Sequence, residues 1–259
     1  MGRIIKSQCR TVENSKSIIG FENTGGGDWI VWDRYICIDG KKAYHIGNIC
    51  GTCEFLFERM DGANQTVSPG ELSHRFKEGL KDLEQGFLDK IDALIPKGNY
   101  IVSIMEIEPR MAQLGSIDDY FFNEQVGSWG IDPFWGLPHY PKVKYYRGID
   151  SKLSATDAFY EFIIPMIPQN WLNEETINTY REDIKSGKKP TALAISVLDI
   201  KAYYDRGINH WCMAHYVIDG HHKVYASCLE GKPITLLSFL ALGQGVSTDI
   251  EVEKLLNMI

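Results

Sequence analysis

Residues 212–242 read CMAHYVIDGHHKVYASCLEGKPITLLSFLAL, and this stretch decides the fold of the second half of the chain. It predicts a strand, a tight glycine turn, a short helix, a glycine stop and another strand. His221, His222 and Lys223 stand at the start of the helix. The N-terminus of a helix carries unpaired N–H groups and a partial positive charge, so it favours anions. A lysine and two histidines there make phosphate the expected guest.

The residues before this stretch predict a second helix and a second strand. Asn173 is a suitable N-cap, and two glutamates follow it in the first turn, where they complement the helix dipole. Apolar residues then recur at helical spacing as far as Ile184, and Gly187 with Pro190 ends the helix. The apolar run over residues 192–198 is typical of a buried strand.

This order of elements resembles the ParB/sulfiredoxin-like superfamily over about 75 residues. The family pattern is a helix, Gly and Pro, a strand, a second strand ending in a Gly-X-X-Arg/Lys turn, a helix and a strand. The string Asp219-Gly-His-His-Lys223 is similar to the Asp-Gly-His-His-Arg form of several members. The resemblance implies a nucleotide-binding domain over residues 161–259, in which Gly220 lets the backbone approach phosphate. His221 and His222 would supply donors and act in catalysis, and Lys223 would supply the cation.

The chain also departs from that pattern. A sulfiredoxin has a cysteine where Gly220 or His221 stands here, so sulfinic-acid repair is not expected. Lys223 replaces the arginine and would bind phosphate as a point charge. ParB proteins continue into a DNA-binding helical domain, whereas about twenty residues follow the last predicted strand here. Partition-complex function is therefore not expected.

The turn has two further interpretations. Asp219 could be the N-cap of an ordinary helix, with the two histidines and Lys223 exposed. Alternatively, His215, Asp219 and a histidine of the turn could hold a metal, as two-histidine, one-carboxylate sets do. An aspartate beside phosphate is itself unfavourable unless Mg²⁺ bridges the two, so Mg²⁺ with a nucleotide is the expected cofactor.

Residues 1–160 predict a separate mixed α/β region, which makes the fold class α+β with two domains. Aromatic and β-branched residues over 28–60 predict strands, with a hairpin turn at Asp39-Gly40. Residues 68–95 predict one long helix that opens with a Ser-Pro-Gly-Glu capping box. Residues 100–107 predict a strand, and residues 108–150 a long ordered loop rich in aromatic side chains.

The cysteines give a second candidate site. Cys50 and Cys53 form a C-x-x-C motif, which can bind Zn²⁺ in a knuckle. Cys37 would be a third ligand, and Cys9 or His45 could complete the set. The same motif can carry redox chemistry when it begins a helix, and buried free thiols behave simply as small apolar groups.

Composition narrows the class of protein. The chain has 259 residues and a net charge of −7, which argues against a nucleic-acid partner. No apolar run reaches the roughly 18–20 residues of a membrane helix, and the N-terminus does not resemble a signal peptide. A cytoplasmic protein without a membrane partner is expected.

Three functions stay open. The first is a Mg²⁺-dependent hydrolase or phosphotransferase acting on a nucleoside triphosphate, with an unknown acceptor. The second is a non-catalytic module that binds a nucleotide and a protein partner. The third is a nuclease, by analogy with other members of the superfamily.

Overall fold

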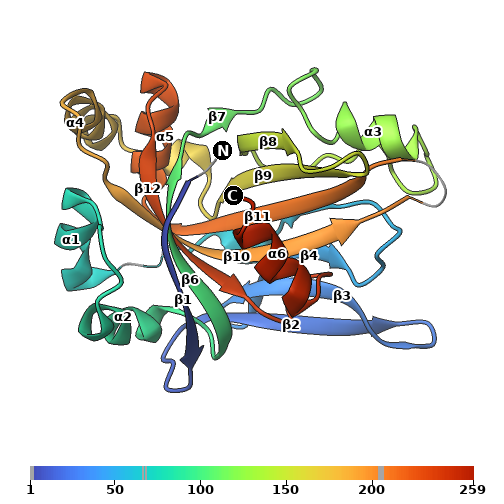
Figure 1. Cartoon of the computed structure of the whole chain (residues 1–259), viewed down its shortest axis with the longest axis horizontal. Helices are drawn as coiled ribbons and strands as arrows, with labels where there is room; N and C mark the ends of the chain where they lie inside the picture. The colour runs from blue at the N-terminus through green and yellow to red at the C-terminus, as the bar shows by residue number, and fades with distance from the viewer. Residues whose placement is uncertain (1–2, 66, 68, 204–206) are drawn as a thin grey trace.

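Eight strands form the main sheet of the computed structural model, which describes residues 3–65, 67, 69–203 and 207–259 (Figure 1). The fold is mixed α/β, as expected. Across the sheet the strands follow the order β1 (Arg3–Val12), β6 (Gly98–Ile107), β12 (Ile234–Ala241), β10 (Thr191–Lys201), β11 (Asn209–Asp219), β9 (Asp157–Pro165), β8 (Tyr146–Lys152) and β7 (Arg110–Met111).

A second sheet covers one face of the main sheet. Its strands are β2 (Ile19–Gly26), β3 (Trp29–Ile38), β4 (Lys41–Asn48) and β5 (Glu58–Arg59). The predicted hairpin at Asp39-Gly40 is confirmed, because Ile38 pairs with Lys41 and both turn residues have positive φ (50° and 70°). Positive φ at both positions is the geometry of a type I′ turn, which matches the twist of paired strands.

The largest apolar core lies between the two sheets. Tyr44 of β4 and Tyr216 of β11 meet there with ring centroids 5.3 Å apart. Aromatic side chains from the intervening loops fill the same layer, and they include Phe55, Phe57 and Phe121. Burial of this many large rings gives the two sheets one shared interior.

The elements predicted for the C-terminal part are confirmed. Helix α4 (Glu174–Lys185) is capped by Asn173, whose side chain accepts from the Thr176 N–H. Strand β10 runs antiparallel to β11, helix α5 (His221–Glu230) follows, and β12 returns parallel to β10. Helices α4 and α5 pack on each other and cover the outer face of the main sheet. Helix α6 (Asp249–Leu256), which was not predicted from the sequence, covers another part of that sheet and opens with a capping box at Thr248.

The long helix predicted over residues 68–95 is wrong. The structure has two short helices, α1 (Ser73–Glu78) and α2 (Gln85–Ile91), with 3₁₀ turns at Gly70–Leu72 and Asp92–Leu94. The chain breaks at Gly79, whose φ is 87°, and a Cβ there would lie 2.4 Å from the Lys189 carbonyl oxygen. The Leu80 N–H then donates to the Thr191 hydroxyl at 2.8 Å, so β10 takes over a bond that the helix would have used. Ser68 of the predicted capping box lies outside the described residues.

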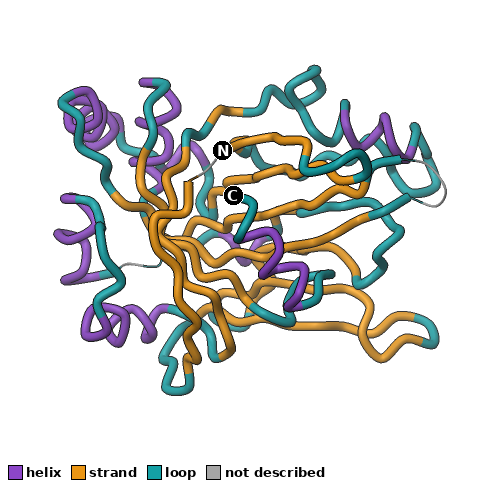
Figure 2. The backbone as a smooth tube through the Cα atoms, in the orientation of Figure 1, coloured by secondary structure: helices purple, strands orange, loops and turns teal. Residues whose placement is uncertain are grey.

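The apolar stripe of that region is nevertheless core, because Phe76, Phe87 and Ile91 are all buried. Figure 2 shows strands through the centre of the molecule, with α1, α2, α4 and α5 gathered at one end of it. None of the described helices has the length and apolar character needed to cross a membrane.

The two regions predicted from the sequence, residues 1–160 and 161–259, both contribute strands to the main sheet. Residues 108–150 hold β7, helix α3 (Glu124–Trp129) and the start of β8 as well as loops. Two further 3₁₀ turns lie at Asp61–Ala63 and Gln169–Trp171. The expected boundary between residues 160 and 161 falls inside β9, and strands from both sides of it pair in the main sheet.

Candidate functional site

The Asp-Gly-His-His-Lys turn joins β11 to α5. Gly220 is left-handed (φ 97°), and a Cβ there would lie 2.8 Å from the Ala192 Cα. Only glycine allows both this φ and this close approach to β10. The N-cap of α5 is Gly220, and no side chain caps the helix, so the interpretation of Asp219 as the N-cap is wrong.

Lys223 points into the protein. It is 3% exposed, and its Nζ donates to the Thr191 carbonyl at 2.8 Å and to Asp219 Oδ2 at 3.3 Å. The ammonium also lies 5.4 Å from the centre of the Phe76 ring. Burial lowers the pKa of Lys223, and Asp219 opposes this shift. In this position Lys223 ties α5 to β10 and β11.

The two histidines of the turn also bind backbone groups. The Met166 N–H donates to His221 Nε2 at 3.1 Å, and the Asn173 N–H donates to His222 Nε2 at 2.9 Å. A nitrogen that accepts a hydrogen bond carries no proton, so both rings are held as neutral acceptors. Burial lowers the pKa of His221 to about 3. The histidines therefore hold the segment between β9 and α4 against the start of α5.

The free donors at the turn are backbone amides. Within α5 the first N–H to bond back is that of Val224, which donates to the Gly220 carbonyl at 2.9 Å. Among the described residues, the N–H groups of residues 221–223 have no hydrogen-bond acceptor. Three unpaired N–H groups at a helix N-terminus with a partial positive charge favour an anion.

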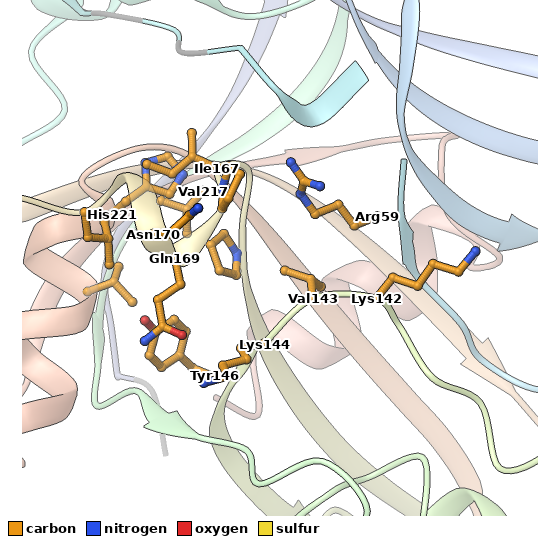
Figure 3. A pocket seen from close by; sticks show the side chains of 14 residues that line it. Arg59, Lys142, Val143, Lys144, Tyr146, Ile167, Gln169, Asn170, Val217 and His221 are labelled. Atoms are coloured by element: carbon orange, nitrogen blue, oxygen red, sulfur yellow. The ribbon is translucent and has the colours of Figure 1, made fainter. Parts of the chain in front are cut away.

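A cavity of about 310 Å³ opens next to the turn (Figure 3). Val217 and His221 form one side of it, Arg59 and Lys142 stand on the opposite side, and Val224 also lines it. Most of its remaining wall comes from the loop at residues 165–170, together with Val143, Lys144, Tyr146 and Leu172. The wall is mainly apolar with cations near the opening, as is usual for small-molecule sites.

The cations at this opening differ in whether other residues of the protein already bind them. Arg59 Nη2 donates to the Ala63 carbonyl at 3.0 Å and to Asn64 Oδ1 at 2.6 Å. Lys142 pairs with Glu58, whereas Lys144 is exposed and has no ion-pair partner in the described part of the chain. Lys144 is thus the cation most available to a ligand.

A second cavity of about 210 Å³ contains the turn itself. Asp219, Gly220, His221 and His222 line it, and Ser73 faces them from the start of α1. His221 and Ile167 line both cavities, so the two cavities are adjacent. The smaller cavity is the more polar one, and it receives the start of α5.

Comparisons of this chain with family models, with curated proteins and with solved structures found no match. The resemblance to the ParB/sulfiredoxin-like superfamily therefore stays a prediction, and the site is interpreted from its own geometry.

The three cysteines predicted as zinc ligands do not form one cluster, because Cys50 and Cys53 lie together without Cys37. Cys50 and Cys53 form a disulfide, with Cα atoms 5.3 Å apart. Cys37 is buried in β3, where its thiol donates to Glu22 Oε2 at 3.5 Å, and burial raises its pKa to about 11. Across the described residues, no three His, Cys, Asp or Glu side chains form a metal-binding group. A zinc ion would require reduction of the disulfide, because bonded sulfurs are not thiolate ligands.

The other metal sets predicted from sequence are also dispersed. His45 Nε2 lies 3.0 Å from Asp33 Oδ1, in the second sheet. His215 is buried in β11, with Nδ1 at 2.7 Å from the Ser196 hydroxyl and Nε2 at 3.3 Å from Glu161 Oε1. It therefore has its own partners, apart from the histidines of the turn.

The structure adds a polar chain that sequence reasoning missed. His210 is 2% exposed, and it lies between the Tyr120 hydroxyl at Nδ1 and the Ser128 hydroxyl at Nε2, each at 2.8 Å. Ser128, His210, Glu124 and Trp129 line a cavity of about 610 Å³. Tyr120 and Ser128 precede His210 by 90 and 82 residues in the sequence, so no local motif could reveal these three residues together.

The hydrogen-bonded series Tyr120, His210 and Ser128 differs from a catalytic triad in one important respect. Burial lowers the pKa of His210 to about 4 and raises that of Tyr120 well above its usual value. Both groups are therefore uncharged at neutral pH. A triad histidine is held by a carboxylate that stabilises its charged form, whereas a tyrosine hydroxyl holds His210. The arrangement is that of a satisfied buried histidine that presents a serine to a cavity.

Proposed function

We propose that this protein binds a nucleotide at the start of α5. The phosphates occupy the smaller cavity, which the first residues of α5 line, and the base with its sugar occupies the 310 Å³ cavity. The observation that supports this most is the position of His221, which lines both the anion-favouring cavity and the apolar one. A phosphate at a helix N-terminus and a ring in an apolar pocket are separate, additive sources of affinity.

A binding module is better supported than an NTP hydrolase or phosphotransferase. The Nε2 atoms of His221 and His222 and the Nζ of Lys223 are hydrogen-bonded to backbone groups. Phosphoryl transfer depends on donors and cations aimed at the transferred group. The nuclease alternative has still less support, because the net charge is −7 and nucleic-acid binding needs basic surface.

Mg²⁺ fits the site as a companion of the phosphates. Asp219 lines the smaller cavity with a side chain that is 23% exposed, and only its Oδ2 is engaged by Lys223. Mg²⁺ commonly binds one or two carboxylates together with phosphate oxygens and water. Bound there, the ion would offset the repulsion between Asp219 and the phosphates.

Thermal unfolding against ATP, CTP, GTP and ADP, each with and without Mg²⁺, tests the proposal. Bound nucleotide at 100 times its Kd adds about 2.7 kcal/mol of stability. The Val143→Trp variant would fill the apolar cavity and is expected to weaken binding at least about tenfold, which corresponds to ~1.4 kcal/mol. Ile250→Trp is the matched control, because Ile250 is 77% exposed on α6 and should leave binding unchanged.

Two results would contradict the proposal. Absence of a shift with every nucleotide would remove the binding function. Steady release of phosphate from a bound triphosphate, lost in an Asp219→Asn variant, would show that the site is catalytic.

A further inference from the structure

The Cys50-Gly51-Thr52-Cys53 loop between β4 and β5 is a second chemical centre, independent of the nucleotide site. All four residues are half-buried, so the loop lies at the edge of the fold and not in its core. The remaining cysteines differ from this pair. Cys37 and Cys212 are buried, Cys9 is exposed and Cys228 is half-buried, and all four are free.

Two donors within the loop are directed at one sulfur. The Cys53 N–H donates to Cys50 Sγ at 3.0 Å, and the Thr52 hydroxyl lies 3.4 Å from the same atom. Hydrogen bonds of this kind stabilise the charged form of a group more than its neutral form. Cys50 is therefore the cysteine whose thiolate the loop would stabilise when the disulfide opens.

Groups outside the loop fix its backbone. The carbonyl of Cys50 accepts from Lys201 Nζ at 2.7 Å, that of Gly51 accepts from the Ala202 N–H at 2.8 Å, and that of Thr52 accepts from Trp129 Nε1 at 3.0 Å. Asn48 Oδ1 also accepts from the Cys50 N–H at 3.0 Å. None of these four bonds involves sulfur, so they persist when the disulfide is reduced. The loop then keeps the two cysteines within reach of each other.

We infer that Cys50 and Cys53 form a thiol–disulfide exchange site whose substrates are low-molecular-weight disulfides such as glutathione disulfide. The Cys50 thiolate attacks one sulfur of the substrate, an S–S bond forms between them, and one thiolate leaves and takes up a proton. The Cys53 thiolate then attacks Cys50 Sγ and expels the second thiol. In total, one protein dithiol and one disulfide give one protein disulfide and two thiols.

The anchoring explains why exchange is favoured over a passive crosslink. A structural disulfide stabilises the fold by constraining the unfolded chain, and that effect grows with the length of the loop it closes. The sequence separation here is 3, so the crosslink restrains very little chain. The same short separation, on a backbone that other groups already hold, favours rapid closure by Cys53.

Glutathionylation of single-cysteine variants tests the assignment. Cys53→Ser leaves Cys50, and Cys50→Ser leaves Cys53, in the otherwise complete protein. After reduction and exposure to glutathione disulfide, mass spectrometry of acid-quenched peptides gives the rate at each site. We expect Cys50 to react at least about tenfold faster than Cys53, because its thiolate fraction is higher. Cys9, which is exposed in both variants, is the internal reference thiol.

The wild-type protein provides the second measurement, which does not depend on how the variants fold. Reduced wild type mixed with glutathione disulfide should form the Cys50–Cys53 bond before Cys9 acquires glutathione, and reduced glutathione in excess should reopen it with the circular dichroism unchanged. Equal rates at Cys50 and Cys53, a disulfide that opens only when the protein unfolds, or one equivalent of zinc on the reduced pair would each overturn the inference.

Discussion

Replacement of Lys223 shows whether this lysine stabilises the fold or binds phosphate. In Lys223→Met the stem is retained and the ammonium is lost, so the Thr191 carbonyl loses its side-chain donor. An unsatisfied buried acceptor costs about 1–3 kcal/mol. The ion pair with Asp219 adds less than about 1 kcal/mol, because that carboxylate is 23% exposed. We expect the free energy of unfolding to fall by about 2 kcal/mol.

Lys223→Ala also removes the three side-chain atoms beyond Cβ that Met retains, a methylene, a sulfur and a methyl group of about methylene size each, next to Phe76 and Tyr180. At about 0.8 kcal/mol for each buried methylene, the loss grows by ~2 kcal/mol beyond that of the Met variant. Urea unfolding followed by circular dichroism measures both variants. Nucleotide affinity of the folded Met variant should stay within about threefold of wild type, which corresponds to ~0.65 kcal/mol.

The pH dependence gives a second readout. Burial lowers the pKa of Lys223 in the folded protein, so the unfolded chain binds more protons and stability rises with pH. The difference in free energy of unfolding between wild type and Lys223→Met should therefore grow as pH approaches 10.5, the ordinary pKa of lysine. If instead Lys223→Ala keeps wild-type stability and loses nucleotide binding, Lys223 is a phosphate ligand and the structural role is wrong.

Three further predictions test the fold. Gly79→Ala should lower the free energy of unfolding in urea by at least about 2 kcal/mol, because φ is 87° and the new Cβ would lie 2.4 Å from the Lys189 oxygen. Gly86→Ala is the control: a Cβ on Gly86 in α2 meets open space, so this variant should be more stable by about 0.5–1 kcal/mol. Arg34→Met leaves Asp199 buried without its partner and should cost about 3–5 kcal/mol, against less than 1 kcal/mol for Arg75→Met at an exposed ion pair. His210 should stay neutral by nitrogen NMR down to about pH 4, so stability should fall as pH drops from 6.5 toward about 4, and titration near 6.5 would contradict its burial.

The sequence predicted the C-terminal elements because their signals are local. A cap at Asn173, a glycine turn at Gly220 and short apolar runs each act over a few residues. It failed at Gly79, where helical periodicity continued. There the backbone contacts Lys189 and Thr191, which lie just before and at the start of β10 and more than 100 residues away in the sequence. Periodicity reports which residues are buried, and only tertiary contacts show where the helix stops.

At the candidate site, too, local features could be predicted from the sequence and tertiary contacts could not. The sequence identified the turn but could not show which way its side chains point. The burial of Lys223 under α1 and the hydrogen bonds of both histidines to the β9–α4 segment depend on chain segments that the motif does not contain. The chain of Tyr120, His210 and Ser128 is non-local in the same sense.

Calorimetric titration of the nucleotide selected by thermal unfolding, with Mg²⁺, into Ser73→Asp and Ser73→Asn tests the central claim most directly. Ser73 is exposed at the wall of the smaller cavity, and the two substitutions have nearly the same size and differ by one negative charge. If phosphates lie at the start of α5, the Asp variant should bind at least about tenfold more weakly than the Asn variant, a difference of ~1.4 kcal/mol that added salt reduces. Equal affinities in the two variants would place the phosphates elsewhere and contradict the account.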